Sequence, residues 1–562
     1  MAKVDGGRLF AKALKKEGVE CVFTLSGGHI MPILYGCREE GIRVIDVRHE
    51  STGGYAAEAY AKVTGKPGIL VTTAGPGITN ATTPMAEAAE TGIPVIHIGG
   101  GSPIRENDTG PLQNVKSFEA MAVFCKWARK IYNSSRVPEY VAMAFRHAYD
   151  DTPGPVYLEI AADVLFQQFE EDEIYWPERY RAFTTAYGDP RLVEQAAEAL
   201  IQADKPAMII GETARFSQQE KNSVEKLANY LKIPVFSQTT SRGVYADERT
   251  NELFRIGEGA IREADVVLEL GVDHSYKIGK GKAPRVNGAA LRIMVHPDLT
   301  KIGYNVPADI GIVAGAGAAS DQIFEMVKAK TKPIQSGSWT DEARELTKMM
   351  RKPFLEAAVS TILPTHPGRV AAEVAKYIET EATDWHVICD GGDAASWIDA
   401  NATASYPGQV VRYGPLGTIG TGQGYSLGAW AADGKPVLYY TGDGSFGFYS
   451  MEFETFVRNN IPLVCVISND SAWGMIKLSE EAKRPDYISE NGHLATTLPE
   501  MFPYEKMAAL WGGVGIRVDH YDDIIPAIRK VRSSGKPGII NVDVDKIAMA
   551  PATAAFAGVK QK

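Results

Sequence analysis

Short apolar runs alternate with longer amphipathic stretches along almost the whole of this chain. In its first part, the runs 43–47, 68–71 and 94–98 are each long enough for one strand, and the sequence between them has the spacing of a helix. A strand buried on both faces reads as a continuous apolar run, and a helix between two such strands makes the pair parallel. The pattern predicts an α/β protein with doubly wound parallel sheets.

The rhythm of strand and helix occurs three times over 562 residues, so we expect three domains and a tail. Their expected boundaries are 1–166, 188–332 and 365–547, followed by a tail at 548–562. The tail is alanine-rich, and we expect it to be mobile. The segment 152–160 resembles 536–542, which suggests that the first and third domains share one fold.

The composition of the chain argues against several classes of function and location. The formal net charge is −10 and the basic residues form no aromatic-studded cluster, which argues against nucleic-acid binding. There is no run of about 18 apolar residues and no continuous apolar core near the N-terminus, so neither a membrane span nor a signal peptide is expected. The five cysteines are scattered without CxxC spacing, which suits a reducing cytoplasm.

Polar residues gather where two expected strands of the third domain end. The run 436–440 leads into Asp443 with a glycine on each side, and the run 461–467 leads into Asn469 and Asp470. The carboxyl ends of neighbouring parallel strands meet at one edge of a sheet, so these side chains should lie together. Their oxygens suit a hard cation such as Mg²⁺, which can bridge to a diphosphate.

This segment resembles the fingerprint of the thiamine-diphosphate enzymes. The chain is similar to the acetolactate synthase and pyruvate oxidase group over essentially its whole length, and within that group it most resembles benzaldehyde lyase. The resemblance is carried by 25–30, 46–50, 55–61 and 112–113 together with the Gly-Asp-Gly segment. It implies a pyrimidine-binding, a central and a diphosphate-binding domain, in that order, with thiamine diphosphate and Mg²⁺ as cofactors.

Three catalytic residues are implied by the resemblance. Glu50 would donate a hydrogen bond to N1′ of the aminopyrimidine, which requires a protonated carboxyl in an apolar pocket. Without the family, a Glu at this place is explained as a first-turn charge of a helix. His29 would move a proton to or from the substrate hydroxyl, although a lone loop His is more often an ordinary hydrogen-bonded residue. Gln113 would hold the substrate oxygen.

The resemblance also implies the contacts of the other half of the cofactor. The Gly417 carbonyl would accept from the 4′-amine, and Ile419 would wedge under the cofactor. Mg²⁺ would take the Asp443 and Asp470 side chains and the Ala472 carbonyl, whereas a one-residue slip would substitute Asn469 and Ser471. Further cofactor contacts are expected from Asp393, Ala394 and Ala395, mainly through backbone N–H groups, and from Gly444, Ser445, Trp473 and Gly474.

Three enzymatic functions remain open. A lyase or carboligase would cleave or form the C–C bond of 2-hydroxy ketones (acyloins) through a C2 carbanion and an enamine, and His29 favours it. An acetolactate synthase acting on 2-oxo acids is supported by 27–32 and 474–476, but the Trp expected soon after this second stretch is missing at 477–480. A 2-hydroxyacyl-CoA lyase would suit the tail, but His29 argues against it. A silent, non-enzymatic relative would lack Glu50 or the metal pair, and both are present.

The resemblance implies that each active site forms between two subunits. One subunit would supply Glu50 and the other the Gly-Asp-Gly segment, which requires a homodimer and is typical of a homotetramer. Ala162, Ala395 and Met475 would line a pocket for small aldehyde, acyloin or 2-oxo acid substrates. No flavin is expected in the central domain, because Val272 stands where flavin-binding relatives carry a different run.

Overall fold

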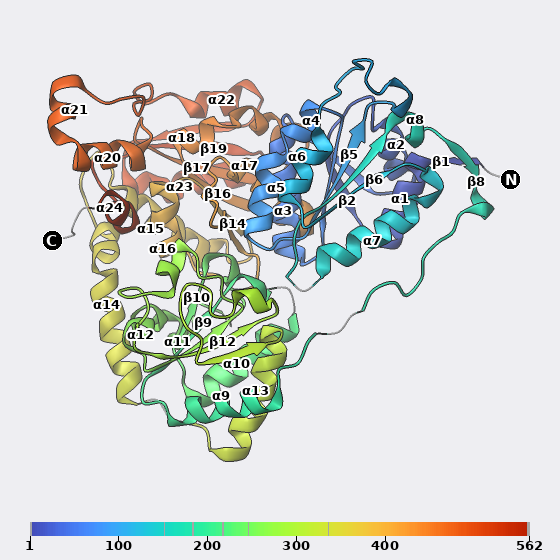
Figure 1. Ribbon diagram of the computed structural model, residues 1–562. Helices are drawn as coiled ribbons and strands as arrows, with labels where there is room; N and C mark the ends of the chain where they lie inside the picture. The colour runs from blue at the N-terminus through green and yellow to red at the C-terminus, as the bar shows by residue number, and fades with distance from the viewer. Residues whose placement is uncertain are drawn as a thin grey trace. The chain divides into compact units, whose positions relative to one another are not determined.

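The computed structural model describes residues 3–150, 152–182, 185–215, 218–245, 247–334 and 337–558. Three open parallel sheets flanked by helices confirm the predicted α/β class (Figure 1). The chain separates into two compact units, one formed by the described residues of 1–184 with 423–434 and the other by the remainder. None of the helices in this described part of the chain has the length and apolar character that a membrane span needs.

The first unit is built on a six-stranded parallel sheet with the strand order β3-β2-β4-β5-β7-β6. Its strands are β2 (Cys21–Leu25), β3 (Arg43–Asp46), β4 (Gly68–Thr72), β5 (Val95–Gly101), β6 (Trp127–Ile131) and β7 (Val156–Ala161). Its helices are α1 (Gly6–Lys16), α2 (Met31–Glu39), α3 (Glu50–Thr64), α4 (Pro76–Thr79), α5 (Thr82–Glu90), α6 (Ser117–Phe124), α7 (Val137–Tyr149) and α8 (Ala162–Leu165). A short antiparallel pair, β1 (Lys3–Asp5) with β8 (Gln168–Glu170), lies beside it. Alternate strand residues such as Ile69 and Val71 join the apolar sides of α1, α2 and α7 in one core.

Helix α17 (Gly422–Asp433) packs closely against α3 within the first unit. A Cβ added at Gly428 would lie 2.0 Å from the carbonyl oxygen of Ala56, so only glycine permits this approach. On the same helix, the Tyr425 hydroxyl donates a 2.9 Å hydrogen bond to Glu58. Glu58 also pairs with Lys62 at 2.6 Å, and both side chains are almost fully buried. Burial raises the pKa of Glu58 to about 7 in spite of this partner.

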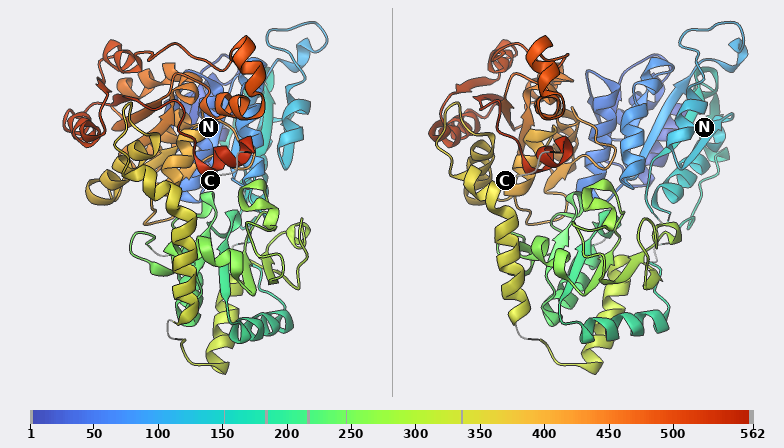
Figure 2. Two further views of the ribbon diagram at one scale, coloured as in Figure 1. Left: turned by 90° about the vertical axis from the view of Figure 1, so that its left-hand side faces the viewer. Right: turned by 60° about the vertical axis from the view of Figure 1, so that its left-hand side comes forward.

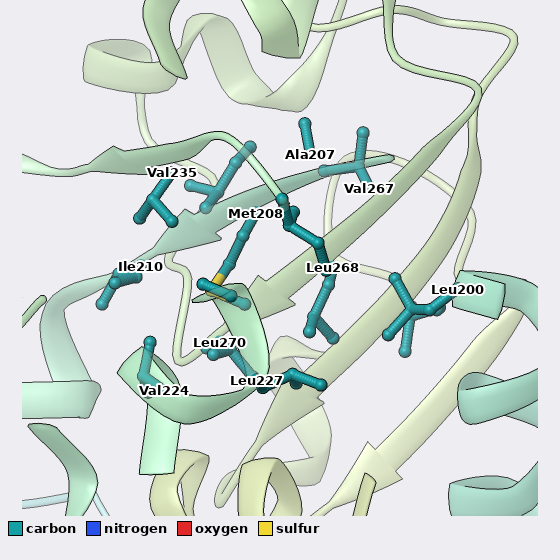
Figure 3. Close-up of a cluster of buried hydrophobic side chains, with 14 of the residues drawn as sticks. Leu200, Ala207, Met208, Ile210, Val224, Leu227, Val235, Val267, Leu268 and Leu270 are labelled. Carbon is teal, nitrogen blue, oxygen red and sulfur yellow. The ribbon is translucent and has the colours of Figure 1, made fainter. Parts of the chain in front are cut away.

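The central domain has a five-stranded parallel sheet in the order β10-β9-β11-β12-β13. Its strands are β9 (Pro206–Ile210), β10 (Val235–Ser237), β11 (Val266–Leu270), β12 (Leu291–His296) and β13 (Ile310–Val313). Its helices are α9 (Pro190–Gln202), α10 (Gln218–Leu231), α11 (Glu252–Arg255), α12 (Gly257–Glu263) and α13 (Ala316–Lys330). The core of this domain gathers side chains from β9 and β11 against Leu200 of α9 and Leu227 of α10 (Figure 3).

The third domain repeats the topology of the first, which explains the resemblance between their last strands. Its sheet has the order β15-β14-β16-β17-β19-β18, so both domains follow the relative order 2-1-3-4-6-5. The strands are β14 (His386–Cys389), β15 (Val410–Arg412), β16 (Val437–Gly442), β17 (Leu463–Asn469), β18 (Val514–Val518) and β19 (Gly538–Asp543). Its helices are α15 (Pro367–Glu381), α16 (Asp393–Asn401), α18 (Asp443–Gly447), α19 (Phe453–Arg458), α20 (Gly474–Lys483), α21 (Pro485–Asn491), α22 (Tyr504–Leu510), α23 (Ile524–Ser533) and α24 (Pro551–Ala557).

The long helix α14 (Ser338–Ala358) connects the central and third domains, packing against α12 at one end and α15 at the other (Figure 2). The tail corrects one expectation, because its described part is not a loose segment. Residues 551–557 form α24, which packs against α16 and α20.

Replacing Leu268 by Ala should destabilise the central domain. Leu268 is fully buried at the centre of its sheet, so the substitution removes apolar contacts and leaves a cavity. The expected loss in the free energy of unfolding is about 2–5 kcal/mol. Leu299→Ala is the matched control, since Leu299 is 69 % exposed in the same domain. Urea unfolding followed by circular dichroism measures both, and equal losses would contradict the assigned core.

Candidate active site

The carboxyl ends of three adjacent strands form the centre of the site in the second unit. β16 pairs in parallel with β14 on one side and with β17 on the other. Asp390 follows β14, Asp443 follows β16, and Asp470 follows β17. The sequence therefore predicted the position of Asp443 and Asp470 correctly, whereas Asp390 was missed.

Asp443 and Asp470 form a hydrogen-bonded carboxyl pair. Asp443 is 2 % exposed, and burial together with the charge of Asp470 raises the pKa of Asp443 to about 8. Burial also raises the pKa of Asp470. Two buried carboxylates in contact cannot both ionise unless a cation compensates them. The pair is therefore a fitting ligand set for Mg²⁺, which binds carboxylate oxygens.

A glycine packs tightly beside this pair. A Cβ added at Gly474 would lie 2.1 Å from Oδ2 of Asp470, so any side chain there would displace the carboxylate. The backbone N–H of Ala472 donates to Oδ1 of Asp470 at 3.2 Å and holds its other oxygen. Among the described residues, no three His, Cys, Asp or Glu side chains come together as a metal set. A cation here would thus take further ligands from backbone carbonyls, phosphate or water.

The residues at the end of β17 have different surroundings, which bears on the two alignments left open there. The side chain of Asn469 turns into the sheet, where its Nδ2 donates to Oδ1 of Asn541 at 3.0 Å. Its Oδ1 accepts from the backbone N–H of Ser471 at 3.0 Å. The Ser471 hydroxyl in turn accepts from the N–H of Met501. Asn469 and Ser471 are therefore engaged within the fold, and Asp470 is the residue that meets Asp443.

The other expected cofactor residues of this unit lie around the pair. Gly444 and Ser445 open α18 directly after Asp443, and a Cβ at Gly444 would lie 2.7 Å from the Trp473 ring. Ala394 and Ala395 are buried in the first turn of α16. The structure thus brings together the segments 393–395, 442–445 and 470–475, as expected from the parallel sheet.

Asp390 positions the loop that carries Gly417 and Ile419. Its fully buried carboxylate accepts hydrogen bonds from the backbone N–H groups of Gly420 and Gly422, both at 3.0 Å, and from the Tyr439 hydroxyl at 3.0 Å. Burial raises the pKa of Asp390, and these hydrogen bonds oppose the rise. Its location one residue after an apolar strand, like that of Asp443, was a signal that could have identified it.

Asp393 has a contact that the sequence did not suggest. Its carboxylate accepts from the backbone N–H of Ala550 at 2.9 Å and from the Thr553 hydroxyl at 2.5 Å, so it holds the start of α24. The indole N–H of Trp397 also donates to it at 2.8 Å. The side chain of Asp393 is thus used by the tail, which leaves only backbone groups at this turn for a cofactor.

In the first unit, Glu50 begins α3 and is 5 % exposed. The Asn80 side chain donates a 2.9 Å hydrogen bond to Oε2 of Glu50. A Cβ added at Gly77 would lie 3.6 Å from Oε1 of Glu50 and 2.9 Å from Cγ2 of Thr73, so these two side chains flank the same glycine. Asn80 was not identified from the sequence, because it lies far from Glu50 along the chain.

His29 and Gln113 meet through a third residue, Thr73, which directly follows β4. Nδ1 of His29 lies 3.2 Å from the Thr73 hydroxyl, which lies 3.5 Å from Oε1 of Gln113. Burial lowers the pKa of His29. The three expected catalytic residues of the first unit, Glu50, His29 and Gln113, are therefore brought to one edge of its sheet.

The three sheets, the buried carboxyl pair and the buried Glu50 are the arrangement expected of a thiamine-diphosphate enzyme. Family models of the thiamine pyrophosphate enzymes match the N-terminal TPP-binding domain at residues 4–121, the central domain at 193–323 and the C-terminal TPP-binding domain at 390–542. The chain belongs to this family, and thiamine diphosphate is its cofactor.

Its relatives include more than one activity. The chain is 31 % identical to an acetolactate synthase large subunit of Mycobacterium tuberculosis, with 96 % of each chain covered. It is 27 % identical to 2-hydroxyacyl-CoA lyase 2 of Bos taurus, covering 96 % of this chain and 91 % of the relative. It is also 27 % identical to a 2-hydroxyacyl-CoA lyase of Arabidopsis thaliana, covering 97 % and 96 %.

Without a divalent cation, the stability of the protein should fall as pH rises through about 8. The folded-state pKa of Asp443 is raised, so its contribution is complete below the ordinary Asp range and is lost as pH rises through the folded-state value. Mg²⁺ should remove this decline, because a cation stabilises the ionised pair. Melting temperatures from about pH 5 to about pH 9, with EDTA or with Mg²⁺, measure the effect. Melting temperatures that change with pH in the same way in EDTA and in Mg²⁺ would contradict this prediction.

Gly474→Ala should weaken Mg²⁺ binding by at least about tenfold, because the new methyl group displaces the Asp470 carboxylate. The readout is the Mg²⁺ concentration that gives half of the maximal rise in melting temperature with thiamine diphosphate present. Gly447→Ala is the control, since nothing lies within 4 Å of a Cβ at Gly447. An unchanged Mg²⁺ requirement in Gly474→Ala would refute the placement of Asp470.

Proposed function

We propose that this enzyme cleaves or forms the C–C bond of 2-hydroxy ketones, and so acts as an aldehyde lyase and carboligase. The observation that carries the proposal is the meeting of His29, Thr73 and Gln113 at the edge where Glu50 also lies. This edge places a titratable base and a neutral hydrogen-bonding group near the expected acid. Such a set suits a substrate whose hydroxyl gives up or receives a proton.

Each residue has a distinct task in this proposal. When bound, thiamine diphosphate would supply a carbon nucleophile and a sink for the electrons of the broken C–C bond. Glu50 would donate a hydrogen bond to N1′ of the pyrimidine, and Asn80 orients its carboxyl. His29 takes the proton of the substrate hydroxyl during cleavage and returns it during ligation. Gln113 holds the substrate oxygen.

In this proposal the second unit binds the cofactor and its metal and orients them. Asp443 and Asp470, with the Ala472 carbonyl, would hold Mg²⁺, whose charge would offset that of the diphosphate. The first turns of α16 and α18 offer backbone N–H groups to phosphate. The Gly417 carbonyl and the Ile419 side chain would contact the pyrimidine, and Asp390 holds their loop in place. Support comes from the raised pKa of both carboxyl groups and from the tight glycine contacts around them.

Oligomerisation and location are part of the proposal. We infer a homodimer at minimum and a homotetramer as the assembled form, with Glu50 and the Gly-Asp-Gly segment of one active site contributed by different subunits. All five cysteines are free and buried, which supports a cytoplasmic location.

Aldehyde release tests the substrate class. Purified protein with thiamine diphosphate and Mg²⁺ should release aldehyde from acyloins. The relatives' names make 2-hydroxyacyl-CoA esters and pyruvate the necessary comparisons. Turnover confined to the CoA esters, or acetolactate formed from pyruvate, would refute the proposal in favour of those activities.

Glu50→Gln should reduce kcat by at least about 100-fold, because the amide cannot supply the proton to N1′. Assembly and the melting temperature without cofactor should be retained, since Gln has the same size. Glu90→Gln is the matched control, because Glu90 is an exposed residue at the end of α5. Steady-state kinetics with an acyloin and native mass measurement provide both readouts. Retained turnover in Glu50→Gln would remove Glu50 as the acid.

A further inference from the structure

Thr73 lies between two of the expected catalytic residues and has no role in the reaction as described so far. Its side chain is 8 % exposed, and its hydroxyl oxygen lies 3.2 Å from Nδ1 of His29. The same hydroxyl donates toward Oε1 of Gln113 at 3.5 Å. It is therefore the link through which the two side chains interact.

The contact between Thr73 and His29 is built into the backbone. A Cβ added at Gly27 would lie 2.4 Å from Cβ of Thr73, so only glycine lets the turn before His29 come this close to Thr73. On the other side, a Cβ at Gly100 of β5 would lie 2.7 Å from Cβ of His29. His29 is thus held between β5 and the residue that follows β4.

The approach of Gln113 is enforced in the same way. Gln113 has a φ of +58°, a left-handed conformation that is uncommon for a residue with a side chain. A Cβ added at Gly75, whose φ is +59°, would lie 2.6 Å from the carbonyl oxygen of Gln113. Gln113 therefore has an unfavourable backbone conformation, and this conformation places it against Gly75, two residues after Thr73.

A hydroxyl group has one proton to donate and two lone pairs that accept. When the Thr73 hydroxyl donates its one proton toward Oε1 of Gln113, its oxygen accepts from His29. Nδ1 of His29 then carries a proton, and Nε2 keeps its lone pair. Burial lowers the pKa of His29 and so favours the neutral ring, and neither Thr73 nor Gly100, which contact it, carries a charge.

We propose that Thr73 is a positioning residue that fixes His29 in the Nδ1-protonated tautomer, so that Nε2 is the atom that takes the substrate proton. The inference rests on the proposed function, because it assigns the reactive nitrogen of the base in that reaction.

The test compares Thr73→Val, which keeps the shape and removes the hydroxyl, with Thr73→Ser, which keeps the hydroxyl. Thr73→Val should lower kcat for an acyloin about 10-fold to 100-fold. The KM for the acyloin should stay within about twofold of the native value. Thiamine diphosphate should raise the melting temperature of the variant about as much as that of the native chain. Thr73→Ser should recover most of the lost rate. If Thr73→Val does not fold, Thr73→Ala against Thr73→Ser makes the same comparison.

The dependence of kcat on pH shows which group donates in the hydrogen bond between Thr73 and Nδ1 of His29. An acceptor at Nδ1 stabilises the imidazolium, so its removal lowers the pKa of His29 and moves the acid limb of kcat to lower pH. A shift to higher pH, an unchanged kcat, or equal losses in Thr73→Val and Thr73→Ser would overturn the inference.

A spectroscopic readout separates this inference from the proposed function. In ¹⁵N-histidine-labelled protein, with the spectrum of His29→Gln subtracted, Nδ1 of His29 should be protonated in the native chain. In Thr73→Val the proton should move to Nε2. If the native chain releases no aldehyde from acyloins, the proposed function fails while the tautomer is still measured. An Nε2-protonated ring in the native chain refutes the role of Thr73 alone.

Discussion

The parallel pairing of β16 with β14 and β17 is the constraint on which the diphosphate half of the site depends. It places the carboxyl ends of three strands side by side, so that Asp390, Asp443 and Asp470 leave the sheet at one edge. A shift in register by one residue would turn the side chains of a strand to the opposite face. The contact between Asp443 and Asp470 is therefore as well specified as the sheet itself.

Buried carboxyl groups then shape the backbone around that edge. Asp390 is fully buried, and it orders a glycine-rich loop because its oxygens satisfy N–H groups that would otherwise have no partner. Asp393 does the same for the first residues of the tail. Burial of a charge is costly unless it is compensated by hydrogen bonds. Each of these side chains consequently has a fixed position. The hydrogen bonds that it accepts fix the backbone of the segment that donates them.

The first and third domains use one topology for two kinds of chemistry. Thr73 follows β4 as Asp443 follows β16, and both strands occupy the third place in the relative order 2-1-3-4-6-5. In one domain the residues at this edge are a hydroxyl, an imidazole and a carboxyl group, and in the other they are two acids beside glycines. Parallel sheets leave the residues after each strand free to vary, because the hydrogen bonds of the strands do not involve them.

The sequence by itself determined the fold class, the repeated domain and most of the candidate residues. Apolar runs, helix spacing and polar residues at strand ends are local properties that can be read along the chain. Only the tertiary structure decided that Asp470 and not Asn469 meets Asp443, that Asp393 binds the tail, and that Thr73 joins His29 to Gln113. These outcomes depend on contacts between segments that are distant in sequence, where packing and backbone approach at single glycines select the partner.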